Sequence, residues 1–351
     1  MEKATLSIFE CKPGMEMAET IHNDFGAVMI REGTILDRQI LNRIESMGIL
    51  EVKIYVQDIE NLKANHNKNI SSKYEQNTQD IKNIMGKVAV GAPLDMTKIR
   101  EITDTISSGI YSSSDMVGPL SLSTDIENYI FTHNINVSFM AMTIGKWMGC
   151  SEKTIKHLTQ AGLLHDIGKC KISNDILNKP GELTDKEYDT IKQHPRYSYD
   201  ILNEVDSIHN DVLLGILTHH EREDGTGYPL GITSEKINLI GKIVAVADIY
   251  DAMTSERIYR KSQTPFEVFE LMQNGSFGKL HPIVLNKFIK NMAEHYRGSK
   301  VELSNGEEGE VVFINYNKIS KPIVKVDGKF IDLSLERGLK INRIFKNNNK
   351  I

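Results

Sequence analysis

The sequence has little that would point to a secreted, membrane-spanning or nucleic-acid-binding protein. Its three cysteines, Cys11, Cys150 and Cys170, are odd in number and lack zinc-like spacing, so neither a disulfide framework nor a thiolate cluster is expected. No apolar run approaches the roughly 20 residues that span a bilayer, and no signal-peptide core follows the charged start. The formal net charge of −5 argues against sequence-independent DNA binding. We therefore expect a cytoplasmic protein in a reducing compartment.

The length of 351 residues predicts two or three folded units. Residues 1–57 mix alternating apolar stretches with turn signals and one helical stretch, which predicts a small α+β module, too short for a response-regulator receiver. Residues 58–118 are expected to hold a linker and a connecting helix. Within them, the Asn-, Lys-, Ser- and Gln-rich stretch 57–77 predicts a solvated linker or an exposed helix at a domain boundary.

Residues 119–297 have helical periodicity, with capping-box patterns at Thr124-x-x-Glu127 and Thr184-x-x-Glu187. After Gly298 the apolar pattern changes to period two, and Asp327-Gly328 is a strong hairpin signal. Residues 298–351 are therefore predicted to form an autonomous β-rich module that takes no part in the chemistry. The expected fold class is mainly α, with a small α+β module before the helical domain and a β-rich extension after it.

Five of the eleven histidines, all in the helical region, and two aspartates of the same region form a set of candidate metal ligands. These candidate metal ligands are His133, His165, Asp166, His194, His219, His220 and Asp248. Imidazole and carboxylate donors suit Fe, Mn, Zn or Ni, and an aspartate can bridge two cations, which a histidine cannot do. Asp248 lies in an otherwise apolar helix, where an unpaired buried carboxylate would cost several kcal/mol and a metal would remove that cost.

Two neighbouring features favour the same chemistry. Lys169 follows Asp166 by three residues and can share its face, where a cation suits phosphate. His194 precedes Pro195, and the clash before a proline is expected to end a helix there and turn the imidazole inward. Any one of these residues alone is a weak signal, and their combination carries the argument.

The region also offers groups for binding a substrate or a partner. His219 and His220 lead into the loop 221–229, whose two glycines and one proline predict a tight, exposed turn suited to a lid or docking surface. Arg257 and Arg260 provide forked donors for phosphate oxygens, and Asp251 could accept from a guanine edge.

These motifs occur together in an order and spacing that resemble the HD-GYP family of the HD metal-dependent phosphohydrolase superfamily. The matching segments are His165-Asp166-x-Gly168-Lys169, His194-Pro195, His219-His220-Glu221-x-x-Asp224-Gly225-x-Gly227-Tyr228-Pro229 and Ala247-Asp248-x-Tyr250-Asp251-Ala252-Met253-Thr254-Ser255. The resemblance covers about half of the chain. It implies an all-helical HD-type domain and hydrolysis of cyclic di-GMP to linear pGpG, often onward to GMP.

The resemblance also implies residue roles. One metal would be held by His133, His165, Asp166 and Asp248, and the other by Asp166, His194, His219 and His220. The metals would be iron or manganese in preference to nickel or zinc. A hydroxide shared by both metals would attack phosphorus. The catalytic residues would be Asp166 and Lys169, and the substrate-binding residues Lys169, Tyr228, Asp251, Arg257 and Arg260.

Three positions depart from the family pattern. Ile258 stands where many members have Pro, His281 where Asp is usual, and Tyr129 where members with a third metal carry Glu. Two metals are therefore expected as the maximum.

Several readings of partner and substrate remain open. The expected partners are cyclic di-GMP and, through the loop Gly225–Pro229, a diguanylate cyclase (GGDEF) domain, and a homodimer is compatible with the sequence. The alternatives are a module that binds cyclic di-GMP without turnover, a phosphohydrolase for cyclic GMP-AMP, and an HD enzyme for nucleoside triphosphates or an alarmone.

Overall fold

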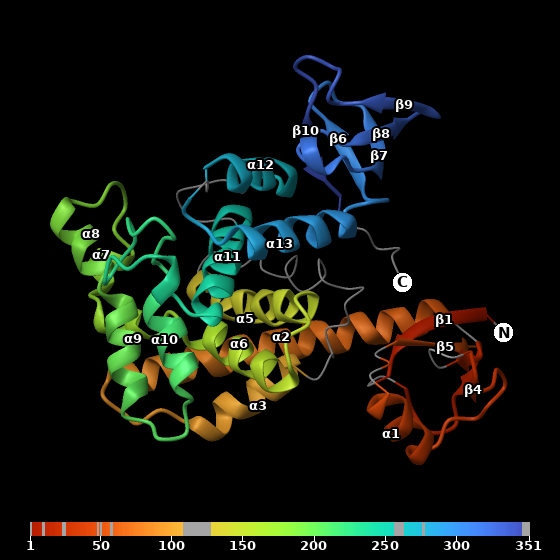
Figure 1. Cartoon of the computed structure of the whole chain (residues 1–351), viewed down its shortest axis with the longest axis horizontal. Coiled ribbons are helices and arrows are strands. Elements are labelled where there is room, and N and C mark those ends of the chain that lie inside the picture. The colour runs from red at the N-terminus through yellow and green to blue at the C-terminus, as the bar shows by residue number, and fades with distance from the viewer. Residues whose placement is uncertain are drawn as a thin grey trace.

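The computed structural model of the protein describes residues 2–8, 11–22, 26–47, 49, 51–56, 59–107, 128–255, 263–275 and 278–345. Along the chain it shows a small N-terminal module, a helical body and a C-terminal sheet (Figure 1). The predicted fold class, mainly α with an N-terminal α+β module and a β-rich extension, is confirmed. Within these ranges, no helix has both the length and the hydropathy needed to cross a bilayer.

The N-terminal module is built around the strand β5, in which buried Val52, Ile54 and Val56 alternate with outward-facing residues. Its sheet has the order β1-β5-β2, with β1 and β2 both antiparallel to β5. The elements are β1 (Glu2–Ser7), β2 (Glu16–Met17), β3 (Ile21–His22), β4 (Val28–Ile30), α1 (Arg38–Ser46) and β5 (Glu51–Val56). The buried residues of this module form a hydrophobic cluster of their own.

The helical body surrounds two helices that are buried over most of their length, α5 and α11. Gly162 of α6 lies against the backbone of Ser138 in α5, so the two helices approach closely where a side chain would not fit. The elements are α2 (Ile59–Ala89), α3 (Met96–Ser107), α5 (Tyr129–Trp147), α6 (Glu152–Leu164), η2 (Ile167–Lys171), α7 (Asn174–Leu177), α8 (Asp185–Ile191), α9 (His194–Asn203), α10 (Asn210–Thr218), η3 (Ser234–Lys236), α11 (Leu239–Thr254), α12 (Pro265–Gly275) and α13 (Pro282–His295).

For residues 57–77 the sequence predicted a solvated linker or an exposed helix, and from Ile59 on the segment belongs to helix α2, which is packed rather than wholly exposed. Figure 1 shows it as a long helix that runs from the N-terminal module along the helical body. Ile70 and Tyr74 are buried and belong to the same hydrophobic cluster as the body helices. The buried positions 70, 74, 77, 81, 84 and 88 follow each other by steps of four and three, the spacing of a helix that packs along another helix.

The C-terminal sheet has the order β10-β6-β7-β8-β9 with antiparallel neighbours. Asp327 and Gly328 have φ of 45° and 80° at the turn between β8 and β9, so the predicted hairpin is confirmed. The elements are β6 (Lys300–Leu303), β7 (Glu308–Phe313), η4 (Tyr316–Lys318), β8 (Ile323–Val326), β9 (Lys329–Asp332) and β10 (Ile341–Ile344). The sheet is not autonomous in its packing, because Val301, Leu303 and Val311 belong to the hydrophobic cluster of the helices.

One predicted helix start can be checked directly. Thr184 caps α8 and accepts from the amide of Glu187, whose carboxylate accepts in return from the Thr184 amide, so this capping box is confirmed. The other predicted box, Thr124 and Glu127, lies outside the described residues.

Candidate metal centre

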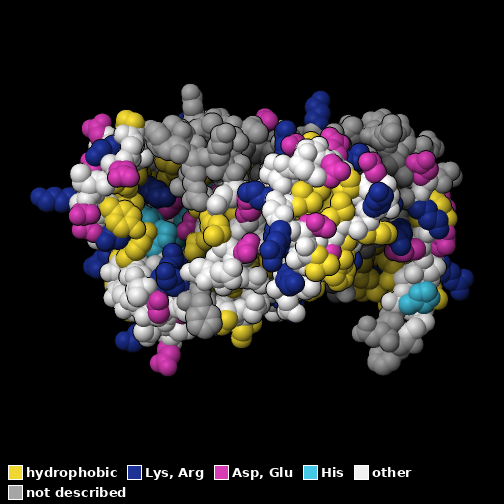
Figure 2. Space-filling model, turned by 90° about the horizontal axis from the view of Figure 1, so that it is seen from above, with side chains coloured by type: hydrophobic (Ala, Val, Ile, Leu, Met, Phe, Trp, Pro, Cys, Tyr) yellow, Lys and Arg dark blue, Asp and Glu magenta, His cyan; other side chains and the backbone are white. Residues whose placement is uncertain are grey.

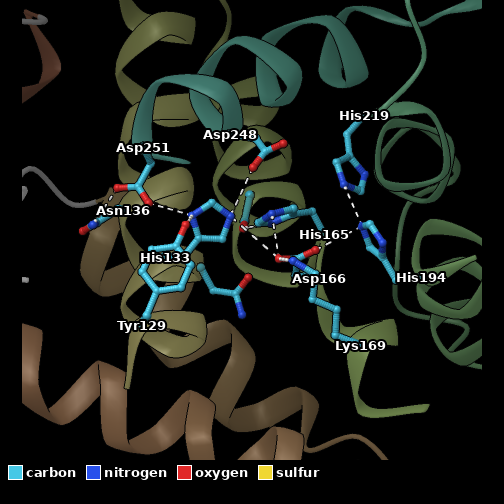
Figure 3. A network of polar contacts seen from close by, with 12 residues as sticks. Tyr129, His133, Asn136, His165, Asp166, Lys169, His194, His219, Asp248 and Asp251 are labelled. Carbon is cyan, nitrogen blue, oxygen red and sulfur yellow. Dashed lines mark hydrogen bonds and ion pairs between the residues drawn. The ribbon is translucent and has the colours of Figure 1, made fainter. Parts of the chain in front are cut away.

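The seven predicted ligands lie together in the middle of the helical body, although 115 positions separate the first from the last. Figure 3 labels all of them except His220. Six are buried, and the side chain of the seventh, His220, is 16% exposed. They come from the start of α5, the end of α6, the start of α9, the end of α10 and the middle of α11. The fold therefore brings the predicted set to one place.

The ligand atoms form two groups. One contains His133, His165 and Asp166, the other contains His194, His219 and His220, and in each group the ligand atoms lie within 4.8 Å of one another. Asp166 faces both groups, because its Oδ2 is 3.5 Å from His165 Nε2 while its Oδ1 is 3.2 Å from His194 Nε2. This is where a bridging carboxylate would have to lie.

Asp248 also reaches both groups. Its Oδ1 lies 3.2 Å from His133 Nε2, and its Oδ2 lies 3.7 Å from His220 Nδ1. The sequence reasoning assigned Asp248 to the first group alone. In the structure two carboxylates, rather than one, connect the groups.

Three of the histidines are oriented by the ends of helices. His165, His194 and His219 each donate from Nδ1 to the carbonyl oxygen three residues earlier, over 2.8, 2.7 and 2.6 Å. Those carbonyls lie in the last turns of α6, α8 and α10, where the helix provides no amide partner. Because Nδ1 carries the proton, the Nε2 lone pair is left for the centre of the cluster.

The expectation for His194 needs correction in its local structure. Helix α8 ends at Ile191, before His194, and His194 is the first residue of α9 with Pro195 in the first turn. Proline is favoured there because its missing N–H would have no helical partner. The imidazole still turns inward, with Nε2 3.4 Å from His219 Nε2.

The charges match what a cation requires. Burial acts to raise the pKa of Asp166, but Lys169 and His165 hold it well below its usual value, and His133 and His220 do the same for the buried Asp248. Burial lowers the pKa of His165, His219 and His220, which keeps them neutral. Ionised carboxylates and neutral imidazoles are the forms that bind divalent metals.

His133 differs from the other histidines. Burial acts to lower its pKa, but Asp248 and Asp251 outweigh burial and raise it to about 9. A cation bound at Nε2 would replace the proton on that nitrogen and would balance the negative charge of Asp248 and Asp251.

A metal fits the polar atoms that the fold leaves unpaired. His165 Nε2 and Asp166 Oδ1 are buried, and the structure gives neither a hydrogen-bond partner. Burying such groups without compensation is costly, and both face the centre of the cluster. The mixed imidazole and carboxylate donors are consistent with a divalent transition-metal site.

Two of the predicted substrate-binding residues, Lys169 and Tyr228, lie beside the ligand cluster. Lys169 donates to Asp166 Oδ2 and keeps a side-chain exposure of 23%, and the ring of Tyr228 packs 4.7 Å from that of His220. Figure 2 shows histidine side chains reaching the surface in a depression at the left, beside basic side chains. Arg257 and Arg260 lie outside the described residues, as does Ile258.

Asp251 lies elsewhere than a guanine contact would require. Its side chain is only 3% exposed, its Oδ2 accepts from His133 Nδ1 over 2.6 Å, and its Oδ1 accepts from Asn136 Nδ2 over 2.8 Å. Both oxygens are therefore engaged behind His133, on the side away from the other ligands (Figure 3).

The loop after His220 is anchored by Glu221, a residue of the matching motif to which sequence reasoning assigned no role. The buried carboxylate of Glu221 accepts from the amides of Leu230, Gly231 and Ile232 over 2.6, 3.1 and 3.2 Å. Gly227 lies so close to the backbone of Glu221 that a side chain could not be placed there. The available signal was an acidic residue directly after two candidate ligands. The loop is thus fixed to the site at its base.

Tyr129 provides a first prediction. Its ring stacks on His133 with centroids 5.4 Å apart, and its hydroxyl is 3.5 Å from His133 Nδ1. A phenol with a reference pKa of about 10 is a poor ligand at neutral pH. We expect at most two bound metals in the native chain and in Tyr129→Phe, whereas Tyr129→Glu should admit a third. Metal analysis with anomalous diffraction would measure this, and three occupied positions with Tyr129 as a ligand would contradict it.

Comparison with known proteins gives consistent matches. The HD domain family model matches residues 111–280. The cyclic di-GMP phosphodiesterase PA4108 of Pseudomonas aeruginosa is 32% identical over 237 residues, which cover 68% of this chain and 57% of that protein. The 3'3'-cGAMP-specific phosphodiesterase 1 of Vibrio cholerae is 35% identical over 175 residues, covering 50% of this chain and 40% of that protein. The chain thus spans about half the length of these relatives.

A solved structure supports the fold. Bd1817 of Bdellovibrio bacteriovorus, described as an HDG"Y"P protein, aligns with a TM-score of 0.51 and 14% identity, covering 82% of this chain and 98% of that one. At this identity the likeness concerns the fold alone.

Proposed function

The chain contains an HD domain of the HD-GYP type, and from this premise we propose that it is a metal-dependent phosphodiesterase that hydrolyses cyclic di-GMP to pGpG. The observation that carries the proposal is the pair of ligand groups with Asp166 between them. A second hydrolytic step to GMP would use the same groups.

The proposed ligand sets follow the two groups. His133, His165, Asp166 and Asp248 would hold one divalent cation, and Asp166, His194, His219 and His220 the other. Bound there, two cations would lower the pKa of bound water toward neutral pH and would neutralise charge on the phosphoryl oxygens. Iron or manganese suits this donor set, and nickel and zinc are the alternatives.

The protein's own groups would orient the substrate. The Lys169 ammonium contacts the buried Asp166 while its own side chain stays partly exposed, so it can donate to a non-bridging phosphate oxygen as negative charge develops. Tyr228 covers His220 and would exclude bulk water from that side. Arg257 and Arg260 are proposed for the second phosphate, because a forked guanidinium matches phosphate geometry.

Hydrolysis of 3'3'-cGAMP is the second candidate, since relatives named for either substrate match at 32% and 35% identity. The two substrates share both phosphodiester bonds and one guanine, so the metal centre alone would not separate them. The two groups of donor atoms and the nearby Lys169 argue against binding without turnover.

Metal removal provides the direct test. The full chain is purified anaerobically, loaded with Mn²⁺ or Fe²⁺, and supplied separately with cyclic di-GMP and 3'3'-cGAMP while products are separated by chromatography. We expect exhaustive chelation to reduce hydrolysis to background and readdition of the metal to restore it, because water activation requires the cation. Full activity after chelation would refute the proposal, and faster turnover of 3'3'-cGAMP would favour the second candidate.

A further inference from the structure

The metal-facing histidine His133 is held from behind by a chain of hydrogen bonds. Its Nδ1 donates to Asp251 Oδ2 over 2.6 Å, which leaves Nε2 directed at Asp248 and Asp166 (Figure 3). A carboxylate in this position fixes the ring and makes the opposite nitrogen a stronger donor to a metal.

This series of hydrogen bonds continues into a helix outside the matched HD region. Asn136 donates from Nδ2 to Asp251 Oδ1 over 2.8 Å, and its Oδ1 accepts from the hydroxyl of Tyr74 over 2.9 Å. Tyr74 belongs to α2, whereas the HD family match begins at residue 111. Helix α2 therefore reaches a metal ligand through two intermediate side chains.

These hydrogen bonds matter energetically because the groups that form them are buried. Tyr74, Asn136, Asp251 and His133 are all at most 4% exposed. A buried donor or acceptor that loses its partner costs about 1–3 kcal/mol, since water cannot replace the partner. The Asn136 amide also has one favourable orientation, because turning it over would place its oxygen against the Asp251 carboxylate.

Helix α2 is itself fixed against the site. Ile81 and Ile84 are buried in the hydrophobic cluster of the body, and Lys82 donates to Asn128 Oδ1 over 2.8 Å at the start of α5. The helix also packs against η2, which carries Lys169. The position of the Tyr74 hydroxyl is thus determined by packing along the helix.

We propose that Tyr74 is a positioning residue for the metal ligand His133, acting through Asn136 and Asp251, so that helix α2 completes the metal centre. The inference rests on the proposed metal-dependent function. It assigns a role in the centre to a residue of the segment for which the sequence suggested a solvated linker or an exposed helix.

The test is the Mn²⁺ affinity of the full chain without substrate, measured by competition with a chromophoric chelator. Tyr74→Phe removes only the hydroxyl, and we expect the Mn²⁺ dissociation constant to rise about 3- to 10-fold, less than the 10- to 100-fold typical of a direct partner of a ligand. Tyr296→Phe is the matched control. It removes a buried tyrosine hydroxyl that bonds Tyr250 over 3.0 Å, and its Mn²⁺ affinity should stay that of the native chain.

A double-mutant cycle separates positioning from general loosening. In an Asp251→Ala background nothing links Asn136 to His133, so adding Tyr74→Phe should change Mn²⁺ affinity less than 2-fold, roughly the limit of additivity for independent sites. Unchanged affinity in Tyr74→Phe, an equal loss in Tyr296→Phe, or additive losses in the cycle would each overturn the inference.

The same measurements distinguish this inference from the proposed function. A native chain that binds Mn²⁺ but leaves both cyclic dinucleotides intact would overturn the proposed function, and the cycle would still decide the role of Tyr74. A native chain that binds none of Mn²⁺, Fe²⁺, Ni²⁺ and Zn²⁺ would overturn both.

Discussion

Replacing Asp166 by Ala should lower kcat/KM for cyclic di-GMP by at least about 10³-fold, a loss of about 4 kcal/mol of transition-state stabilisation. The reason is its place between the ligand groups, with one oxygen near His165 and the other near His194. Removing it also leaves the Lys169 ammonium without the carboxylate that pairs with it. The variant should bind at most one metal.

Activity, metal content and circular dichroism of the full chain would measure this together. Asp200→Ala is the matched control, because Asp200 is an exposed carboxylate on α9, the helix that begins at His194. Lys169→Ala should keep both metals and chiefly slow turnover, since that ammonium contacts Asp166 but is not itself a ligand. An Asp166→Ala chain with the native rate would show that the site assignment is wrong.

The sequence was most informative where residue type and spacing carry the chemistry. Imidazole and carboxylate side chains in the 133–248 region could be selected as candidate ligands from residue type and spacing, because few other functions need that combination. The helical periodicity around Asp248 and the period-two pattern after Gly298 likewise predicted α11 and the C-terminal sheet. These features depend on local pattern alone.

What could not be predicted depends on contacts between distant segments. Asp251 and His133 are 118 residues apart, so the carboxylate could be taken for a substrate contact until both oxygens were seen to be engaged. His165 and His219 are oriented by backbone carbonyls, and such contacts cannot be deduced from the residue types. In α2, the polar composition around Tyr74 outweighed the spacing of its few apolar positions, although that spacing decides the packing.

The second large effect is expected from Gly168→Ala, a change of one methyl group in η2. A Cβ at this position would lie far inside van der Waals contact with the carbonyl oxygen of His194 and the amide nitrogen of Ser198. Both are backbone atoms at the start of α9, and they cannot turn away as a flexible side chain could. Ser198 Oγ also accepts from the Gly168 amide and donates to the His165 carbonyl, each over 2.8 Å. The methyl group would therefore separate η2 from α9.

Because α9 carries His194 and η2 follows Asp166, that separation would pull the ligand groups apart. We expect the free energy of unfolding to fall by about 3 kcal/mol and the melting temperature by about 6–12 °C. Metal binding at the His194 group should be lost even where the chain remains folded. Calorimetry and metal analysis at a temperature below the transition would measure both effects.

Gly86→Ala is the control, because it is expected to change the free energy of unfolding in the opposite direction. Gly86 lies in α2, where a Cβ would meet nothing within 4 Å, so the same substitution should stabilise the helix by about 0.5–1 kcal/mol. Two identical changes in residue type are thus expected to act in opposite directions, because one position contacts backbone and the other faces open space. If Gly168→Ala kept native stability and both metals, the packing of η2 on α9 could not be what holds His194 beside Asp166.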